Sequence, residues 1–288
     1  MKNILVTGSN GQLGNELRNL SIHYPNFNMI FTDLPELDIT ERIACESFIK
    51  KHNIDFLINC AAYTAVDKAE SEPELAFKLN KEAPAILTEL AAKHHFTLVH
   101  FSTDYIFDGQ HFEPYTEQDT PNPSSVYGKS KLEGETAILN SASCAIIIRT
   151  SWLYSAYGHN FVKTILRLAR EKEIINIVYD QVGTPTYAAD LAKCILDMLK
   201  SRKIEGQHIY NYSNEGVCSW YDFANAIIEL RGLQCKIVPI RSADYPTAAP
   251  RPPYSVLDKS KIKKDVEIHI PWWKDSLALC LQFMQKQI

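Results

Sequence analysis

The sequence lacks the runs and clusters that mark several classes of protein. None of its seven cysteines stands in a C-x-x-C pair, so the pattern predicts neither a disulfide framework nor a thiolate metal site. No basic run is long enough to follow a phosphate backbone, and the net charge is -4, which argues against nucleic acid as a partner. Reduced thiols of this kind are typical of the cytoplasm.

Long apolar runs are also missing. The N-terminal stretch MKNILVTG stops being apolar at Gly8, which makes it too short for the core of a signal peptide and for a membrane span. The chain has no internal repeat and no low-complexity segment. Hydrophobic residues make up 45% of its 288 residues, enough to fill a sizeable core. We therefore expect a globular, cytoplasmic protein with no membrane partner.

Short apolar segments alternate with amphipathic stretches along most of the chain. Continuous apolar strands separated by helices are typical of a parallel sheet buried on both faces. The predicted fold class is α/β, a Rossmann-type doubly wound parallel sheet with a smaller C-terminal substrate-binding lobe. The expected sheet strands are 3–7, 27–32, 55–60, 97–102, 145–150 and 174–178.

The alternation becomes less regular after about residue 200. The proline-rich segment 245–253 forbids regular structure and reads either as a linker or as a substrate loop. The elements expected around it are a strand at 208–213, a helix at 219–232, a strand at 236–240 and a final helix at 272–287.

These elements suggest two units. We expect residues 1–151 to form a dinucleotide-binding Rossmann domain, with 174–205 returning to it. Residues 152–173 and 206–288 are expected to form the substrate-binding lobe.

Three glycines, Gly8, Gly11 and Gly14, stand between the first predicted strand and the first predicted helix. Glycine lets the backbone turn tightly and approach a pyrophosphate, whose charge then meets free N–H groups and the positive end of the helix dipole. Strand-to-helix turns use glycine without any ligand, so the spacing alone is weak. Its position directly after an apolar strand favours nucleotide binding.

An acidic residue follows at the spacing expected for ribose recognition. Asp33 ends the second predicted strand, 19 residues after Gly14, close to the usual offset of about 20. A carboxylate there binds both ribose hydroxyls of NADH and repels the 2′-phosphate of NADPH. The other reading is a turn aspartate, and Asp38 in the same loop is an alternative near the adenine. No arginine follows Asp33 directly, so Arg42 is the nearest candidate for a phosphate clamp.

Three groups suited to ketone reduction come next. Thr103 ends the fourth predicted strand, where open α/β sheets place ligands, and Tyr127 and Lys131 share one helical face because they are four residues apart. Hydride addition to a ketone leaves negative charge on oxygen, so a proton donor must lie within hydrogen-bond reach. Because a neighbouring lysine favours the phenolate, Tyr127 is the predicted proton donor, with Thr103 holding the carbonyl oxygen.

With these residues in place, the sequence resembles the extended short-chain dehydrogenase/reductase superfamily, and within it the dTDP-4-dehydrorhamnose reductases. The resemblance implies NAD(P)H-dependent reduction of the 4-keto group of dTDP-4-dehydro-6-deoxy-L-mannose to dTDP-L-rhamnose, the last step of dTDP-rhamnose biosynthesis. The implied cofactor is NADPH, with NADH also accepted. The segments that carry the resemblance are TGSNGQLG, AAYTAVDKAESEPELAFKLN, STDYIFDG, YGKSKLEGE, RTSWLY, NFVKTILRLA, DQVGTPTYAADLA and RPPYSVLD.

The resemblance also assigns roles to residues. The implied catalytic residues are Tyr127, Lys131 and Thr103, and the implied substrate contacts are Thr103, Asp104 and Trp152. By composition alone Trp152 reads as a core residue, and Arg251 joins the substrate group because its planar fork suits a diphosphate. The implied cofactor contacts are Gly8, Gly11, Gln12, Leu13, Gly14, Asp33, Asp38, Ile39, Ala62, Tyr63, Thr64, Ser102, Tyr127 and Lys131.

The sequence differs from related proteins at two sites that bear on metal binding and on the type of reaction. Some members of the family bind Mg²⁺ through glutamates at a dimer interface. Glu16 matches the first, but Ala189 stands at the second with Asp190 beside it, which does not favour such a site. Tyr105 stands where dehydratases carry an acidic residue, which favours net reduction. The alternatives are a sugar-nucleotide epimerase or dehydratase and a non-catalytic regulatory subunit, and the resemblance leaves a homodimer open.

Overall fold

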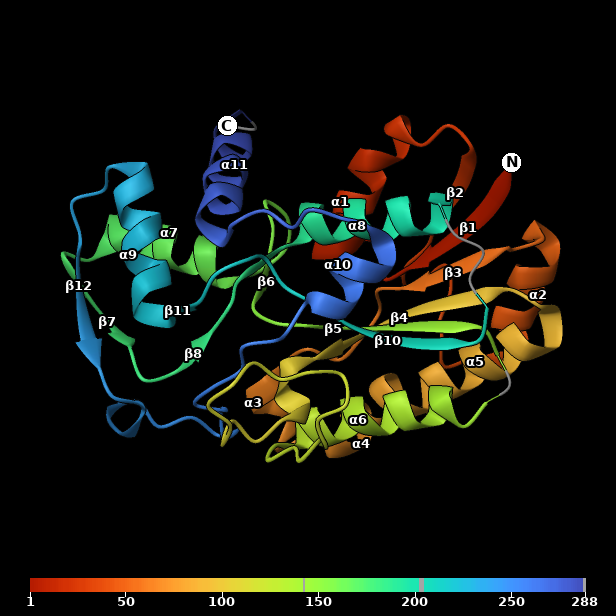
Figure 1. Cartoon of the computed structure of the whole chain (residues 1–288), viewed down its shortest axis with the longest axis horizontal. Coiled ribbons are helices and arrows are strands. Elements are labelled where there is room, and N and C mark those ends of the chain that lie inside the picture. The colour runs from red at the N-terminus through yellow and green to blue at the C-terminus, as the bar shows by residue number, and fades with distance from the viewer. Residues whose placement is uncertain (142, 202–204, 287–288) are drawn as a thin grey trace.

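The computed structural model describes residues 1–141, 143–201 and 205–286. Helices cover both faces of a six-stranded parallel sheet, whose strands lie in the order β10-β5-β4-β3-β1-β2 (Figure 1). The strand order reverses between β1 and β3, the point at which doubly wound sheets bind ligands. The strands are β1 Lys2–Thr7, β2 Phe27–Phe31, β3 Phe56–Asn59, β4 Thr97–Thr103, β5 Ala145–Thr150 and β10 Gln207–Tyr212.

The central strands form because their side chains are apolar on both faces. Successive side chains of a strand point to opposite faces. Ile4 and Val6 of β1 accordingly join the hydrophobic cluster shared with α1 and α8, whereas Leu5 joins the cluster shared with α2 and α5. All three side chains are fully buried. The predicted doubly wound parallel sheet is therefore confirmed.

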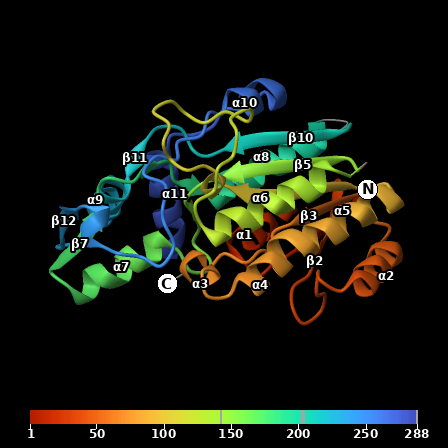
Figure 2. The same cartoon turned by 90° about the horizontal axis from the view of Figure 1, so that it is seen from below.

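The helices of the larger domain form the two outer layers. Figure 2 shows α5 and α6 side by side over one face of the sheet, and α1 packs against α8 on the other. Single turns lie at Ser21–His23, Lys78–Glu82 and Asp104–Ile106. The helices are α1 Gln12–Leu20, α2 Arg42–His52, α3 Val66–Ala69, α4 Pro73–Phe77, α5 Ala83–His94, α6 Val126–Leu139, α8 Ala188–Ser201 and α10 Ser260–Val266.

The smaller lobe has a hydrophobic core of its own, in which Phe223, Ile227 and Leu277 are fully buried. Strand pairs β7–β12 and β6–β9 are parallel, and β8–β11 is antiparallel. Its elements are β6 Leu153–Tyr154, α7 Phe161–Glu171, β7 Ile174–Val178, β8 Val182–Gly183, β9 Thr186–Tyr187, β11 Cys218–Ser219, α9 Trp220–Arg231, β12 Lys236–Ile240, a turn at Ser242–Asp244 and α11 Trp273–Lys286.

Two strands occupy different sheets from those expected. The segment 174–178 does not join the main sheet, because β7 pairs with β12 in the lobe, where Ile174 and Asn176 are exposed. The segment 208–213 does not belong to the lobe, because β10 pairs with β5 as the edge strand of the main sheet. Later in the segment 174–205, α8 packs on α1 of the larger domain. Residues 202–204 and 287–288 of the expected segments lie outside the described residues.

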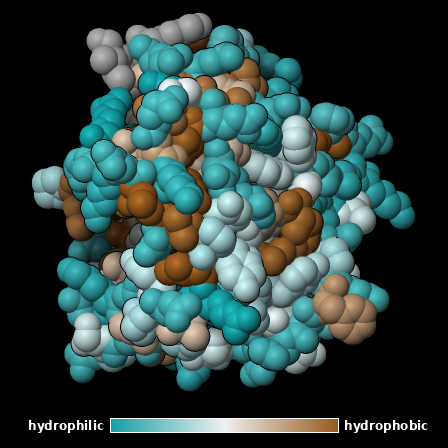
Figure 3. Space-filling model, turned by 90° about the vertical axis from the view of Figure 1, so that its left-hand side faces the viewer, coloured by the Kyte–Doolittle hydropathy of each residue, from teal (hydrophilic) through white to brown (hydrophobic). Residues whose placement is uncertain are grey.

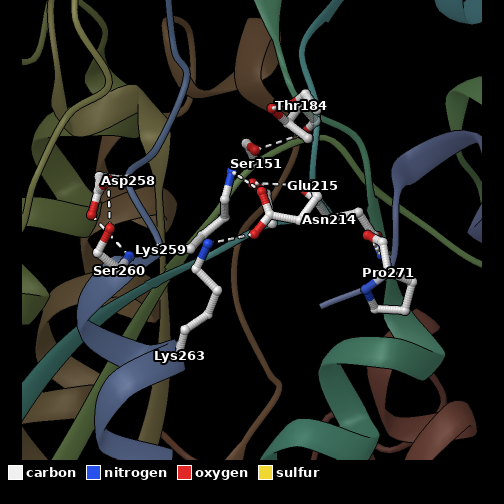
Figure 4. Close-up of polar contacts among 11 residues, drawn as sticks. Ser151, Thr184, Asn214, Glu215, Asp258, Lys259, Ser260, Lys263 and Pro271 are labelled. Atoms are coloured by element: carbon white, nitrogen blue, oxygen red, sulfur yellow. Dashed lines mark hydrogen bonds and ion pairs between the residues drawn. The ribbon is translucent and has the colours of Figure 1, made fainter. Parts of the chain in front are cut away.

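The lobe meets the main sheet at a polar junction beyond the ends of β5 and β10 (Figure 4). The Glu215 carboxylate accepts a hydrogen bond from Lys263 Nζ of α10 at 2.7 Å, and the buried Lys259 Nζ lies 3.7 Å from it. Ser151 Oγ donates to the Thr184 carbonyl at 2.7 Å. Among the described residues, no helix has both the length and the apolar run needed to cross a bilayer.

Candidate active site

The glycine loop is built for close backbone approach. Gly8 has a φ of +63°, and a Cβ there would lie 2.5 Å from the Ala61 backbone nitrogen. A Cβ on Gly14 would lie 2.5 Å from Ser9 Cα. Gly11, the residue before α1, supplies no side-chain hydrogen bond to the free N–H groups of the helix. The loop therefore presents open backbone donors at a helix N-terminus, which fits a pyrophosphate.

The carboxylate of Asp33 lies beside this loop. Its Oδ2 accepts from the Asn10 backbone N–H at 2.9 Å, and its Oδ1 accepts from the Leu34 N–H at 2.8 Å. The Asp38 carboxylate accepts from the backbone and hydroxyl of Thr40, which lowers the pKa of Asp38. Asp33 thus lies beside the glycine loop, where its contact with the ribose stays a prediction, and Asp38 accepts hydrogen bonds within its own turn.

Not every predicted cofactor residue presents a side chain to the loop. Leu13 and Ile39 are buried in the two cores of the larger domain, so only their backbone is available to a ligand. Gln12 accepts a hydrogen bond from Asn160 Nδ2 of the lobe at 3.0 Å. After β3, Ala62 is half-buried and Thr64 is exposed.

The three predicted catalytic residues converge where β4 ends and α6 begins. A Cβ on Gly128 would lie 2.2 Å from the Tyr105 carbonyl oxygen, so α6 can approach the turn after β4 only because this residue is glycine. The Tyr127 ring packs edge-on against Tyr105, with centroids 5.7 Å apart, and shares a hydrophobic cluster with Tyr63. Thr103 Oγ1 donates to Asp104 Oδ1 at 3.0 Å.

Burial controls the acidity of this group. It raises the pKa of Tyr127 to about 12, an effect that hydrogen bonding to the Thr103 side chain opposes. It lowers the pKa of Lys131 to about 8, against the opposing charge of Glu135. The phenol therefore carries its proton at neutral pH, as a proton donor must.

A buried polar chain lies beneath Lys131. Asn59 Oδ1 accepts from Thr7 Oγ1 at 2.8 Å and from the Ala61 N–H at 3.2 Å, so Nδ2 of the same amide donates to His100 Nδ1 at 3.2 Å. The ring proton of neutral His100 then sits on Nε2, 3.5 Å from Lys131 Nζ. Burial lowers the pKa of His100. The histidine is therefore an uncharged neighbour of the lysine, and with its ring proton on Nε2 it offers the ammonium no acceptor.

Two buried oxygen atoms beside this group lack a hydrogen-bond partner of suitable geometry among the described residues, Ser102 Oγ and Asp104 Oδ2. Burial raises the pKa of Asp104 to about 6, and the side chains of Ser255 and Thr103 offset this only partly. Buried polar atoms of this kind are normally paired. The site therefore offers unmet hydrogen-bonding capacity where β4 ends, which fits a polar ligand there.

A cavity of about 650 Å³ opens beside Tyr105, within the size range of small-molecule sites. Its lining comes from the lobe as well as the larger domain and includes Phe161, Ile177, Trp220 and Tyr245. Figure 3 views the molecule from the lobe end and shows hydrophobic side chains gathered in patches on that face.

Trp152 stacks face to face on Trp220, with ring centroids 3.7 Å apart. Its backbone has a φ of +47°, unusual for a bulky residue, and a Cβ on Gly183 would lie 2.9 Å from its ring. Trp152 is thus half-buried, with one face already covered. The predicted sugar contact of Trp152 stays a prediction.

The proline-rich segment 245–253 crosses from the lobe to the larger domain. Arg251 forms a two-point ion pair with Asp67 of α3, at 3.0 Å from Nη1 and 2.7 Å from Nη2. The Ala249 N–H donates to the same carboxylate at 3.1 Å. Arg251 also lines the cavity beside Tyr105, so the segment closes one side of the cavity.

Comparison with known proteins connects this geometry to a family. The family described as "RmlD substrate binding domain" matches residues 1–286. The dTDP-4-dehydrorhamnose reductase of Aggregatibacter actinomycetemcomitans is 41% identical over 287 residues, covering 96% of this chain and 97% of that protein. The chain belongs to the dTDP-4-dehydrorhamnose reductase family.

Solved structures of this reductase family share the fold closely. The dTDP-4-dehydrorhamnose reductase of Clostridium acetobutylicum has a TM-score of 0.93 and 40% identity, covering 98% of this chain and 99% of that one. The reductase of Bacillus anthracis, solved in complex with NADP, has a TM-score of 0.93 and 34% identity, covering 98% of this chain and 100% of that one. The family suggested by the sequence motifs is therefore confirmed.

The acidic residues weighed as Mg²⁺ ligands are engaged within the reductase chain itself. Glu16 is buried and accepts from Ser155 Oγ at 2.6 Å, and burial raises its pKa. Asp190 Oδ2 accepts from Asn214 and Ser276. Over residues 1–141, 143–201 and 205–286, no group of three or more His, Cys, Asp or Glu side chains is arranged to hold a metal ion.

Sequence reasoning missed part of the site. Arg42, the candidate phosphate clamp, is paired with Glu89 on α5, whereas Arg18 lies at the glycine loop. His100 stands between Val99 and Phe101 in β4, and no spacing rule links it to Asn59 or Lys131. The sequence also carried no sign of the cavity wall formed by Trp220 and Tyr245, because these residues come from segments that are far apart in the chain.

Proposed function

We propose that this enzyme reduces the 4-keto group of dTDP-4-dehydro-6-deoxy-L-mannose to give dTDP-L-rhamnose, using NADPH and also accepting NADH. The observation that carries the proposal is the convergence of Thr103, Tyr127 and Lys131 where β4 ends and α6 begins. The names of the full-length relatives and the NADP complex of the Bacillus anthracis reductase support it.

The glycine loop and Asp33 would hold the dinucleotide. When bound, the reduced nicotinamide supplies a hydride to the carbonyl carbon. The Tyr127 phenol gives its proton to the carbonyl oxygen as negative charge develops there, and the Thr103 hydroxyl holds that oxygen. Lys131 in its ammonium form stabilises the phenolate that remains. These steps balance, since the carbonyl gains one hydride and one proton and becomes an alcohol.

The remaining groups would bind the sugar nucleotide. Asp104 Oδ2, which lacks a hydrogen-bond partner of suitable geometry among the described residues, would accept from a sugar hydroxyl, and the half-buried Trp152 would pack on a sugar ring. The fork of Arg251 suits the diphosphate, which would take the place of the Asp67 carboxylate that both Nη atoms bind in this structure. Tyr105 offers no carboxylate for dehydration at the position after Asp104, which favours reduction over the dehydratase and epimerase alternatives. Three intact catalytic side chains speak against a purely regulatory subunit.

The cellular setting belongs to the same proposal. We place the enzyme in the cytoplasm, where reduced cofactor and sugar nucleotides are available. The homodimer left open by the family resemblance is tested by sedimentation velocity on the purified chain.

One experiment tests the function. Purified protein is given dTDP-4-dehydro-6-deoxy-L-mannose with NADPH, cofactor oxidation is followed by absorbance, and the product is identified by NMR. We expect one dTDP-L-rhamnose for each NADPH oxidised, with Tyr127→Phe as the inactive control. Cofactor oxidation with a different sugar product would refute the assignment of substrate, and no oxidation at all would refute the assignment of activity.

A further inference from the structure

Arg18 lies on the second turn of α1 and turns back toward the glycine loop. Its Nη2 donates to Ser9 Oγ at 3.1 Å, and its guanidinium carbon lies 4.4 Å from the centroid of the Phe31 ring. Phe31 is the last residue of β2, two positions before Asp33. The guanidinium therefore lies where the glycine loop meets the end of β2.

Backbone N–H groups of the glycine loop donate hydrogen bonds across this junction. The Ser9 N–H donates to the Thr32 carbonyl at 3.1 Å, and the Asn10 N–H donates to Asp33 Oδ2 at 2.9 Å. The loop, Arg18 and the Asp33 carboxylate thus share one small region. In a doubly wound sheet this is where the adenosine ribose of a dinucleotide lies.

The charge of Arg18 has no carboxylate partner in the part of the chain that the structure describes, although the side chain is exposed. Four other arginines are each paired with a carboxylate: Arg42 with Glu89, Arg149 with Glu135, Arg167 with Glu171 and Arg251 with Asp67. A guanidinium has five N–H donors, of which one is used here. Arg18 thus keeps most of its fork available to a second ligand.

We propose that Arg18 binds the 2′-phosphate of NADPH and thereby sets the cofactor preference of this enzyme. The inference rests on the proposed function, because it requires a dinucleotide at the glycine loop. A phosphate on the ribose 2′-oxygen would lie close to the Asp33 carboxylate, and like charges repel. A stacked guanidinium at the same junction offsets that repulsion and donates charge-assisted hydrogen bonds. Asp33 then serves the free ribose hydroxyls of NADH, so one site takes both cofactors.

The test measures binding rather than turnover. Dissociation constants for NADP⁺, NAD⁺, 2′,5′-ADP and 5′-AMP are obtained by calorimetry on the wild type and on Arg18→Met, which removes the charge but keeps apolar packing on Phe31. We expect Arg18→Met to weaken NADP⁺ and 2′,5′-ADP by on the order of 10- to 100-fold, the usual range for a hydrogen bond to a charged group. The affinities for NAD⁺ and 5′-AMP should change by less than about twofold, since these two ligands lack the 2′-phosphate.

Two further variants separate the rival readings. Arg42→Met tests the arginine that the sequence offered as a phosphate clamp, and Arg167→Met, on α7 of the lobe, is a matched control for loss of an exposed arginine. Both should leave the ratio of NADP⁺ to NAD⁺ affinity unchanged. Arg18→Lys should retain part of the preference, because an ammonium keeps the charge but not the fork. This variant also keeps the test valid if Arg18→Met fails to fold.

The outcomes distinguish this inference from the proposed function. Equal weakening of NADP⁺ and NAD⁺ in the Arg18 variants, or no change in either, would overturn the role of Arg18 while leaving a dinucleotide site in place. A selective loss in Arg42→Met would move the phosphate contact to α2. If the wild type binds neither dinucleotide, the proposed function fails and this inference fails with it.

Discussion

Tyr127 is the proton donor of the proposed reaction. Its pKa is raised by burial, so its proton leaves only when a developing oxyanion and the Lys131 ammonium favour transfer. We expect Tyr127→Phe to lower kcat by on the order of 10²- to 10⁴-fold, the usual contribution of a positioned general acid. The Kd for NADPH should stay within about twofold. Steady-state kinetics with calorimetry check this, and near-normal turnover would remove Tyr127 from the mechanism.

Asp104 provides a prediction of pH dependence. Its pKa is raised by burial from 3.8 to about 6, so the folded state favours the protonated carboxyl. The stability from this group is fully present below about pH 4 and is lost as the pH rises through about 6. Asp104→Asn should therefore unfold like the wild type at about pH 4 and be more stable at about pH 7.5, by up to about 3 kcal/mol.

Asp108 is the matched control for this measurement. Hydrogen bonds from the Gln110 backbone and from Asn122 lower the pKa of Asp108, so its contribution has the opposite sign and is present above the unfolded pKa. Asp108→Asn should lose stability at about pH 7.5 relative to about pH 4. Denaturant unfolding of both variants at the two pH values decides the question. Parallel pH curves for Asp104→Asn and the wild type would contradict the prediction.

At this scale the sequence revealed the residues that follow a spacing rule. Tyr127 and Lys131 share a helical face, and Asp33 follows Gly14 at the ribose offset, so both features could be read without a structure. Arg18 and His100 could not, because their partners come from other elements, Phe31 in one case and Asn59 in the other. Only the folded chain brings those pairs together.

At the scale of elements, the approach of α6 to β4 depends on Gly128. Glycine inside a helix usually destabilises it by about 1 kcal/mol relative to alanine, so Gly128→Ala on an isolated helix would be favourable. Here the new Cβ would lie 2.2 Å from the Tyr105 backbone oxygen, and backbone cannot move aside easily. We expect the substitution to lower the melting temperature and to reduce kcat at least about tenfold, because Tyr127 moves with α6.

Thr136→Ala, on the exposed face of the same helix, is the control for that substitution. It raises helix propensity without a clash, so stability should be unchanged or slightly increased. Thermal unfolding and kinetics of the two variants separate the steric effect from the propensity effect. A Gly128→Ala protein with full activity would show that α6 tolerates displacement.

The sequence did not predict which sheet two of the strands join. The segment 174–178 is apolar enough to be read as a buried sheet strand, yet β7 has alternating exposure and pairs with β12. The segment 208–213 follows a region of weak pattern, yet β10 closes the main sheet next to β5. Apolar runs predict that a strand forms, but the choice of partner depends on contacts between residues far apart in the chain.

At the scale of the whole molecule, the contact between Arg251 and Asp67 joins the lobe to the larger domain. We expect Arg251→Ala to raise KM for the sugar nucleotide more than about tenfold, because it removes both the ion pair with Asp67 and the proposed contact with the diphosphate. Asp67→Ala removes only the ion pair and should change KM by less than about threefold. Steady-state kinetics test both. Equal effects of the two substitutions would show that Arg251 acts through its ion pair with Asp67 alone.

Removal of divalent cations should leave the enzyme active. Glu16 and Asp190 already accept hydrogen bonds within the chain, and Ala189 offers no oxygen ligand on its side chain. Turnover measured with and without EDTA should therefore differ by less than about twofold. Complete loss that magnesium restores would overturn this expectation.

The edge position of β10 has a consequence for the molecule as a whole. The chain leaves the main sheet after β5, builds part of the lobe, returns through α8 and β10, and then leaves again. Neither unit is a continuous stretch that could be excised, transplanted or shuffled as a module. Cutting the chain before β10 would leave the backbone N–H and C=O groups of β5 without their partners on that side. A calorimetric scan should accordingly show a single cooperative transition.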